Sequence, residues 1–242
     1  MNIILDDVNK TYDKHVLKDI SLKVHHANAI AIIGKSGCGK STLLRLLSGL
    51  ERPDSGYIKI DETEIIEKNI KSYQDEIGMV FQQHNLFPHL SLYENIMFIL
   101  TKGKKINKDL AASLSKRILT KLHLEDEMDK KPKFVSGGQA QRASIARAFV
   151  TDPKIIFMDE PTAALDPILT KEVLDTVVDL KDTGTDFIFV THELSFVSDF
   201  ADYVVFMNAG EIIEHGSVDI LRNPKTKDLR RFLQNERSIH VS

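Results

Sequence analysis

The stretch GKSGCGKS, Gly34 to Ser41, contains the residue types that hold a phosphate group. It fits the pattern G-x-x-x-x-G-K-[ST] and lies between AIAIIG and STLLRLLSGL, which predict a strand and a helix. Glycines let the backbone wrap round a phosphate, and successive N–H groups with the helix N-terminus supply positive potential. Lys40 would reach the β- and γ-phosphates, and Ser41 would ligate Mg²⁺. The alternative, a tight turn without a ligand, is disfavoured by the strand and helix on either side.

Two other predicted strands end in ionisable residues. KIIFMDE is an apolar run that ends in Asp159 and Glu160, and DFIFVTH brings His192 to the end of another strand. Ligands gather at the C-terminal ends of parallel strands, so we expect all three residues beside the phosphate loop. Asp159 suits Mg²⁺, Glu160 could deprotonate an attacking water, and His192 would contact the γ-phosphate. Taken alone, Asp159 and Glu160 could instead mark a solvated strand end, and His192 could instead be a structural histidine.

The segment FVSGGQAQR, residues 134–142, begins an amphipathic helix with two glycines. Ser136 and Gln139 fit a capping box, which leaves the glycines unexplained. Each glycine in a helical turn costs about 1 kcal/mol relative to alanine. Gly137 and Gly138 therefore indicate either an unusual backbone angle or a close approach to the backbone. A helix start with bare N–H groups and a serine hydroxyl is suited to bind an anion.

Hydrophobic periodicity divides the chain into three parts. Up to about Gln83 the apolar runs are short and β-like, with one helical stretch from Lys40 to about Leu50. Between about Ser91 and Val150 the pattern is helical, with segments near 92–101, 107–123 and 138–150. Afterwards strands and helices alternate to the end of the chain, which indicates βαβ units around a buried parallel sheet.

Composition indicates an ordinary globular protein. The chain has 242 residues, of which 42% are hydrophobic and 28% charged, enough for one sizeable core. Its 32 basic and 35 acidic residues leave a net charge of -3, so no broad electrostatic footprint for nucleic acid is expected. The single cysteine, Cys38, excludes an internal disulfide framework and fits a reducing compartment. The first ten residues lack the pattern of a secretory signal, and no segment is expected to span a membrane.

With these motifs in this order, the chain resembles the ATP-binding-cassette (ABC) ATPase subunit of a bacterial importer over nearly its whole length. GKSGCGKS looks like the Walker A motif, VSGGQAQR the signature, IIFMDE the Walker B motif, AALD the D-loop and VTHE the H-switch. Gln82 in VFQQ falls at the Q-loop, and Tyr12 in KTYDKHVLKDISL falls at the aromatic residue that stacks on adenine. Val135 and Ala140 replace the usual leucine and glutamine of the signature, from which we expect altered packing but retained phosphate binding.

The resemblance implies an α/β fold with a P-loop NTPase (RecA-like) core, an N-terminal antiparallel β subdomain and an inserted α-helical subdomain. We expect a single ABC ATPase domain over residues 1–242. Its catalytic core with the β subdomain would comprise residues 1–85 and 151–242, and residues 86–150 would form the helical subdomain carrying the signature. The implied ligands are ATP and Mg²⁺.

The resemblance also assigns site residues. Those implied to take part in hydrolysis are Glu160, His192 and Gln82. Those implied near the metal ion are Ser41, Gln82 and Asp159. Those implied to contact the nucleotide are Tyr12, Gly34, Lys35, Ser36, Gly37, Cys38, Gly39, Lys40, Ser41, Thr42, Ser136, Gly137, Gly138, Gln139 and Asp166.

The family's partners follow from the same resemblance. Two copies would close head-to-tail over two ATP molecules, so that Ser136, Gly137 and Gly138 face the γ-phosphate held by the partner subunit. In the region near Gln82 to Leu92, the apolar residues Leu86, Phe87, Pro88 and Leu90 follow Gln82 without strand or helix periodicity. This region is either a buried loop or the surface that meets a membrane permease. The complete system would include a solute-binding protein and no nucleic acid. The chain would then lie peripherally on the cytoplasmic face of the inner membrane.

Less specific features of the sequence indicate the transporter subtype and argue against other classes of ATPase and GTPase. Three segments are most similar in sequence to the ATPase subunits of polar-amino-acid importers: VFQQHNLFPHLSLYENI, DEPTAALDP and VFMNAGEIIEHG. ATPases of lipoprotein release share much of this sequence. A soluble ABC protein acting on nucleic acid or ribosomes is disfavoured, because a second cassette, a coiled-coil insertion and a basic patch are missing. A nucleotide switch without turnover is disfavoured by Glu160 and His192, and a GTPase by the lack of an N-K-x-D motif. The solute, the direction of transport and the permease are not predicted.

Overall fold

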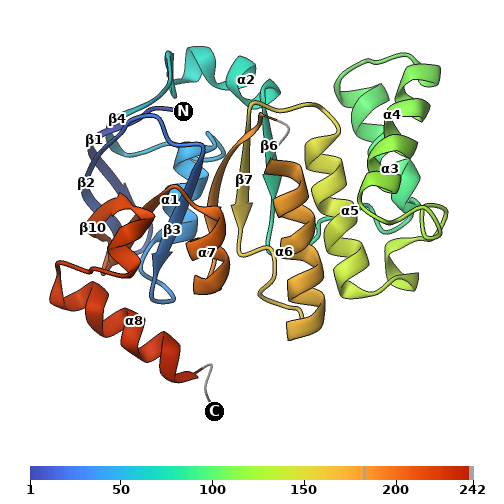
Figure 1. Cartoon of the computed structure of the whole chain (residues 1–242). Helices are drawn as coiled ribbons and strands as arrows, with labels where there is room; N and C mark the ends of the chain where they lie inside the picture. Colours follow the sequence, from blue (N-terminus) through green and yellow to red (C-terminus); the bar gives the residue numbers. More distant parts are fainter. Residues whose placement is uncertain (182–183, 240–242) are drawn as a thin grey trace. The chain divides into compact units, whose positions relative to one another are not determined.

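The structure is a computed structural model that describes residues 1–181 and 184–239 (Figure 1). The chain forms two compact units, each of which is treated by itself. Unit 1 comprises Met1–Ile77 and Asp186–Ser242, and unit 2 comprises Gly78–Thr185. One boundary follows the first residue of β6 (Ile77–Val80) and the other directly precedes β8 (Asp186–Val190), and both units contain strands and helices.

Unit 1 contains an antiparallel sheet of four strands in the order β2-β1-β4-β5. The strands are β1 (Ile3–Thr11), β2 (His15–Val24), β4 (Ser55–Ile60) and β5 (Thr63–Glu64). Along β2 and β4, buried apolar residues alternate with more exposed ones, as expected for a sheet with one face against the core. This sheet is the antiparallel β subdomain predicted from the sequence.

Unit 1 also contains four strands of a second sheet, in the order β10-β9-β3-β8. They are β3 (Ala29–Gly34), β8 (Asp186–Val190), β9 (Tyr203–Asn208) and β10 (Glu211–Ser217). Strand β3 pairs in parallel with β8 and β9, whereas β10 is antiparallel to β9. Every residue of β3 is buried, as expected for a parallel strand covered on both faces.

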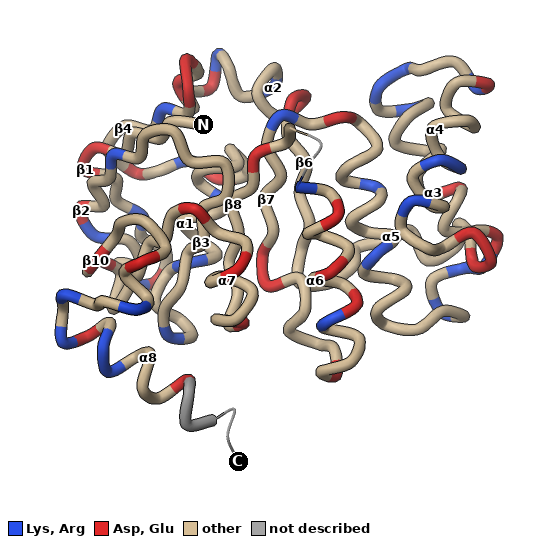
Figure 2. The backbone as a smooth tube through the Cα atoms, in the orientation of Figure 1, with Lys and Arg blue, Asp and Glu red and all other residues tan. Residues whose placement is uncertain are grey.

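The helices of unit 1 flank these sheets. They are α1 (Lys40–Leu47), α2 (Glu67–Asp75), α7 (Leu194–Phe200), a 3-10 turn (Val218–Leu221) and α8 (Lys227–Ile239). Basic and acidic residues are mixed along α8, as Figure 2 shows, which is typical of a solvated helix face. Its other face buries Leu229, Phe232 and Leu233.

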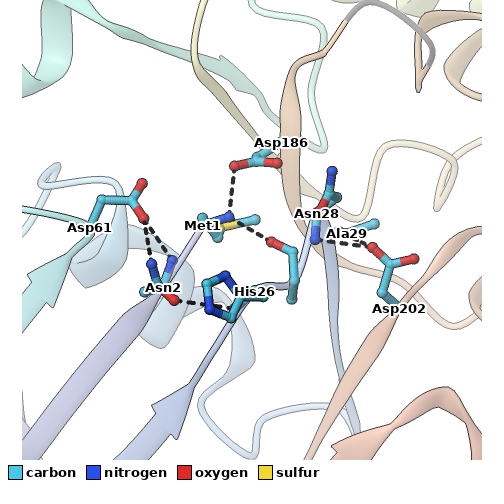
Figure 3. A network of polar contacts seen from close by, with 9 residues as sticks. Met1, Asn2, His26, Asn28, Ala29, Asp61, Asp186 and Asp202 are labelled. Atoms are coloured by element: carbon cyan, nitrogen blue, oxygen red, sulfur yellow. Dashed lines mark hydrogen bonds and ion pairs between the residues drawn. The ribbon is translucent and has the colours of Figure 1, made fainter.

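A polar network within unit 1 attaches Met1 to Ala27 and Asp186 (Figure 3). The amino group of Met1 donates to the carbonyl of Ala27 at 2.8 Å and forms an ion pair with Asp186 at 3.0 Å. Burial raises the pKa of Asp186, and the neighbouring amino group opposes that shift only in part. Nearby, a carboxylate oxygen of Asp202 accepts from the backbone N–H groups of residues 28–29, each at 3.0 Å. These contacts hold the starts of β3 and β8 beside the first strand.

Unit 2 combines two strands with the helical part of the chain. Its strands are β6 (Ile77–Val80), which starts at the boundary, and β7 (Ile155–Asp159). Its helices are α3 (Leu92–Phe98), a π-helical segment (Ile99–Gly103), α4 (Lys108–Lys121), a 3-10 turn (Pro132–Phe134), α5 (Gly137–Phe149) and α6 (Pro167–Lys181). Helix α3 begins at a capping box in which Ser91 and Glu94 exchange hydrogen bonds of 2.8 and 3.1 Å. Helices α3, α4 and α5 pack against one another (Figure 1).

The predicted fold class is confirmed, with one helix missed. The α/β core, the antiparallel subdomain and the helices between Ser91 and Val150 are present. The expectation of a single helical stretch before Gln83 was wrong, because α2 also forms there. Tyr73 is the only buried residue of α2, so its sequence EKNIKSYQD has no apolar stripe to reveal a helix. The division at residues 86–150 stays a prediction; the segment lies inside unit 2, which extends further on both sides.

Candidate functional site

The phosphate loop joins the end of β3 to the start of α1 in unit 1. Glycines occupy positive φ angles at three points of the loop: 150° at Gly34, 73° at Gly37 and 105° at Gly39. A Cβ atom at Gly34 would lie 2.2 Å from the carbonyl oxygen of Met207, which no side chain tolerates. The spacing of the glycines is therefore required by the path of the backbone, which leaves N–H groups at the start of α1 facing the loop.

Lys40 is one of the two lysines of this loop, and only 4% of it is exposed. Its ammonium group donates to the carbonyls of Gly34 at 3.0 Å and Lys35 at 3.1 Å. The side chain thus folds back across the loop that it would serve in phosphate binding. Cys38 is buried beside it, and burial raises the pKa of the thiol although Lys40 opposes the shift. This agrees with a small packing residue in preference to a reactive thiol.

His192 lies at the same edge of the sheet as the phosphate loop. In the parallel pairing of β3 with β8, Ile32 is opposite Val190. Gly34 and His192 each follow that pair by two residues, so both emerge at the C-terminal ends of neighbouring strands. The hydroxyl of Thr191 accepts from the N–H of Glu193 at 3.1 Å and shapes the turn on which His192 lies. Unit 1 therefore brings these two predicted site residues together.

Tyr12, predicted to stack on adenine, lies directly after β1 and is 49% exposed. Its hydroxyl donates to the carboxylate of Glu51, and the ammonium of Lys10 lies 5.4 Å from the centre of its ring. An exposed ring held at its hydroxyl end presents a flat surface suited to stacking.

The predicted Walker B residues follow a fully buried strand, β7, in unit 2. Asp159 is the last residue of that strand and is itself buried, while Glu160 is partly exposed. Glu160 has a positive φ of 46°, which is uncommon for a residue with a side chain. The chain turns at this point, and the N–H of Ala163 donates to the carbonyl of Glu160 at 3.2 Å. Local strain thus sets the direction in which the glutamate leaves the strand.

The signature segment forms the predicted capping box at the start of α5. The N–H of Gln139 donates to the Ser136 hydroxyl at 3.2 Å, and the Ser136 N–H donates to the Gln139 amide oxygen at 2.9 Å. Both glycines lie inside the helix, so an unusual backbone angle is not the reason for them. A Cβ atom at either glycine would come within 3.0 Å of a leucine side chain, Leu165 for Gly137 and Leu169 for Gly138. Close packing is therefore one physical reason for the pair.

Asp166, predicted as part of the D-loop, caps the helix that packs on these glycines. One of its carboxylate oxygens accepts from the N–H groups of Ile168 and Leu169, both at 3.0 Å, at the start of α6. Leu169 is the residue that approaches Gly138. Unit 2 therefore brings the D-loop and the signature together through α6.

Gln82 is exposed and follows β6, and the loop after it is held by residues that the sequence did not single out. Gln141 and Arg147 of α5 and Asn95 of α3 donate hydrogen bonds to backbone carbonyls of that loop. Two of them, Gln141 and Asn95, are fully buried. For Gln141 and Asn95, an amide side chain at a buried helix position was the only signal in the sequence.

The predicted site residues are thus divided between the units. Unit 1 contains Tyr12, Gly34–Thr42 and His192, and unit 2 contains Gln82, Ser136–Gln139, Asp159, Glu160 and Asp166. The part of the chain that the structure describes contains no group of three or more His, Cys, Asp or Glu side chains placed to hold a metal ion. Within residues 1–181 and 184–239, no helix combines the length and apolar character needed to cross a bilayer.

The comparisons with known proteins agree on one family. A family model described as ABC transporter matches residues 17–163. The arginine transport ATP-binding protein ArtM of Bacillus subtilis is 42% identical over 236 residues, which is 96% of this chain and 98% of the relative. A glutamate/glutamine/aspartate/asparagine transport ATP-binding protein, BztD of Rhodobacter capsulatus, is also 42% identical, over 96% of this chain and 89% of the relative. A solved dimeric post-hydrolysis state of an ATP-binding cassette, bound to ADP and phosphate, superposes with a TM-score of 0.80 at 29% identity, covering 89% of this chain and 98% of its own.

Proposed function

Because the chain belongs to the ABC transporter family and is an ATP-binding ATPase subunit, we propose that it powers a separate membrane permease for the import of polar amino acids. The observation that supports this most is the 42% identity to an arginine transport ATP-binding protein over nearly the whole of both chains. A relative named for acidic amino acids and their amides is equally identical, so the proposal extends to the class of solute only.

For the nucleotide we propose contacts by the phosphate loop and Tyr12. The backbone of Gly34–Thr42 would surround the phosphates, and Lys40 would exchange its two loop carbonyls for phosphate oxygens. The exposed ring of Tyr12 would stack on the adenine base. Glycine is required at positions 34 and 39 of this loop, because a Cβ atom there would lie 2.2 Å from the Met207 carbonyl oxygen or 2.8 Å from the Leu17 side chain.

For hydrolysis we propose Glu160 as the base that takes a proton from the attacking water. His192 would contact the γ-phosphate, and Gln82 would orient the water. The donors proposed for Mg²⁺ are the Ser41 hydroxyl, the Gln82 amide oxygen and the Asp159 carboxylate, all hard oxygen ligands that suit this ion. When bound, Mg²⁺ would neutralise charge on the phosphates.

The composite site is proposed to form between two copies of the chain. In a head-to-tail dimer, Ser136, Gly137, Gly138 and Gln139 of one subunit would face the γ-phosphate held by the other, and Asp166 would lie nearby. The start of α5 suits this role because Gly137 is exposed and its helix begins with N–H groups and a serine hydroxyl. A cassette of similar structure is dimeric with ADP and phosphate bound.

The permease would contact the region from Gln82 to Leu92. Phe87 and Phe98 form an edge-to-face pair with centroids 5.0 Å apart in this region, and Phe98 is 41% exposed. An exposed aromatic surface next to the loop suits a protein partner. The chain would therefore lie peripherally on the cytoplasmic face of the membrane, and a solute-binding protein would complete the system. No nucleic-acid partner is proposed.

Purification of the native complex tests the proposed function. The chain is captured under mild detergent conditions, its membrane subunit is identified, and the complex is placed in liposomes with ATP and a panel of labelled amino acids. We expect ATP-dependent uptake of a polar amino acid, and loss of uptake in a complex containing Glu160→Gln. A membrane subunit that moves lipoproteins, or a chain purified without any membrane subunit, would contradict the proposal.

A further inference from the structure

The side chain of Arg147 attaches helix α5 by hydrogen bonds to the loop that follows Gln82. One terminal nitrogen of the guanidinium donates to the carbonyl of Asn85 at 2.6 Å, and the other donates to the carbonyl of His84 at 3.1 Å. Both acceptors belong to the segment 81–90, which we call the Gln82 loop. Asn85 has a positive φ of 50°, so the guanidinium holds the loop where its backbone is in an unfavourable conformation.

Arg147 is placed at some energetic cost. Among residues 1–181 and 184–239, no carboxylate forms an ion pair with it, and burial lowers the pKa of its guanidinium. A partly buried cation that faces only carbonyl groups adds little to stability compared with an apolar residue of similar size. What the planar guanidinium provides is geometry, because two donors fix two successive carbonyls of the loop at once.

Gln141 makes a second connection from the same helix to the same loop. It is fully buried, and its amide oxygen lies 2.5 Å from Nδ1 of His84, which must therefore be the donor. Its amide nitrogen donates to the carbonyl of Phe81 at 3.5 Å. The first half of the Gln82 loop is thus attached to α5 at 81, 84 and 85.

The second half of the loop is attached to a different helix. Asn95 of α3 is fully buried; it accepts from the N–H of Phe87 at 2.7 Å and donates to the carbonyls of Phe87 at 3.2 Å and Ser91 at 2.8 Å. The loop is therefore fixed at one end to α3 and at the other to α5. A force applied to the loop acts on α5 through Gln141 and Arg147.

We propose that Gln141 and Arg147 are positioning residues that couple the Gln82 loop to the signature at the start of α5. The helix is continuous from Gly137 to Phe149, so Arg147 lies ten residues, or about 15 Å, from the signature glycines along one rigid rod. When the loop is displaced by a membrane partner, the rod carries that displacement to Ser136–Gly138. The identity of that partner rests on the proposed function, whereas the coupling between loop and helix does not.

Hydrogen exchange in the isolated chain tests the coupling directly. The background is Glu160→Gln, in which bound ATP is expected to persist, and exchange of the amides in 84–90 and 136–142 is measured with and without ATP; the segment starts at 84 because Gln82 itself is proposed to contact the bound nucleotide and its metal ion. In this background we expect ATP to slow exchange in both segments by about fivefold or more, since coupled sites share their ordering. Adding Gln141→Ala or Arg147→Gln is expected to abolish the effect at 84–90 and keep it at 136–142.

Three comparisons separate positioning from general structural support. Arg147→Lys retains the charge but offers no planar pair of donors, and is expected to restore the effect only in part. Arg117→Gln removes an exposed cation from α4 and is expected to change neither segment. His84→Ala combined with Gln141→Ala is expected to lose no more than Gln141→Ala alone, because the contact between the two side chains is already missing in that variant.

The coupling is overturned if ATP protects 84–90 as strongly in the Gln141→Ala and Arg147→Lys chains as in the Glu160→Gln chain without them. These two variants remain informative if Arg147→Gln does not fold. In the purified complex with its permease, the matching readout is the ratio of permease-stimulated to basal ATP hydrolysis. This ratio is expected to fall about fivefold in Gln141→Ala with the KM for ATP within about twofold. Loss of both rates together, with an unchanged ratio, argues against positioning. Absence of stimulation in the unsubstituted complex contradicts the proposed function and leaves the exchange result to decide the coupling.

Discussion

Glu160 shows how a single backbone angle can serve chemistry. A left-handed conformation costs about 1–2 kcal/mol for a residue with a Cβ atom, and Glu160 adopts it directly after the last residue of β7. The neighbouring Asp159 continues the strand and is buried, so two successive carboxylates leave the sheet in different directions. One of them can then serve the metal ion while the other reaches the water, which is the division of roles that we propose.

Replacing Glu160 by glutamine tests the role of its carboxylate. Glu160→Gln keeps the shape and the turn but removes the base, so we expect ATP to bind while hydrolysis slows by about 100-fold or more. Closed dimers should accumulate because the bound ATP persists. Phosphate release measures the rate, and size-exclusion chromatography with ATP measures the dimer. Wild-type turnover in this variant would exclude Glu160 as the base.

Two glycines of the phosphate loop make a matched pair. Both have positive φ, but a methyl group at Gly37 meets open space, whereas one at Gly34 meets the Met207 carbonyl at 2.2 Å. Gly37→Ala should lower the free energy of unfolding by about 1–2 kcal/mol from its backbone angle alone. Gly34→Ala should lower it further and weaken ATP binding, because the backbone itself must move. Urea unfolding measures the stability of each variant, and ATP titration measures its affinity for the nucleotide. Equal losses in the two variants would mean that movement elsewhere relieves the clash at residue 34.

At the scale of elements, sequence patterns identified the parts whose residues are constrained by packing. The strand β3 and the capping box at α5 were predictable because an apolar run and a serine–glutamine pair are local signals. Helix α2 was not, since it buries one side chain only. The attachment of the Gln82 loop to α5 was also invisible, because Arg147 meets its acceptors across more than sixty residues of sequence. Contacts between distant segments depend on the fold and leave no periodicity.

Glu214 of β10 anchors the last helix of the chain. Its buried carboxylate accepts from the N–H groups of Lys225 at 2.9 Å and Thr226 at 2.8 Å and from the Thr226 hydroxyl at 2.5 Å, just before α8. Burial raises the pKa of Glu214, but these hydrogen bonds lower it by more, and the net shift is downward. Its stabilisation is therefore present above the ordinary glutamate value of 4.5 and is lost as the pH falls through the lower value of the folded chain.

Glu214→Gln is expected to lower the free energy of unfolding at pH 7 by about 1–3 kcal/mol, because it replaces a charged acceptor with a neutral one. The difference from the unsubstituted chain should narrow as the pH falls below 4.5. Denaturant unfolding between pH 3 and pH 8 measures this dependence. Glu211→Gln, at an exposed position of the same strand, is the control and should have little effect at any pH. A loss for Glu214→Gln that is independent of pH would rule out the carboxylate charge as its cause.

At the scale of the whole molecule, no single segment of the chain contains a complete site. The phosphate loop and His192 belong to unit 1, while Glu160 and the signature belong to unit 2. The individual motifs could be predicted because each requires fixed residue types at fixed spacing. Which motifs share one ATP molecule could not be derived from spacing, because a signature placed on a partner subunit obeys no distance within its own chain. The resemblance to ABC ATPases supplied that expectation.

Mixing two inactive variants tests whether the site is shared between subunits. Lys40→Ala should abolish tight ATP binding, and Ser136→Arg should place bulk and charge where the partner's phosphate is expected. A mixed head-to-tail dimer has both lesions in one site and neither in the other. Equal mixing should therefore restore up to about a quarter of the wild-type sites, because half of randomly formed dimers are mixed and each has one intact site of two. ATPase assays measure the recovery, and differently tagged subunits establish mixing. If tagged mixed dimers form and remain inactive, Lys40 and Ser136 act within one subunit, and the head-to-tail arrangement is wrong.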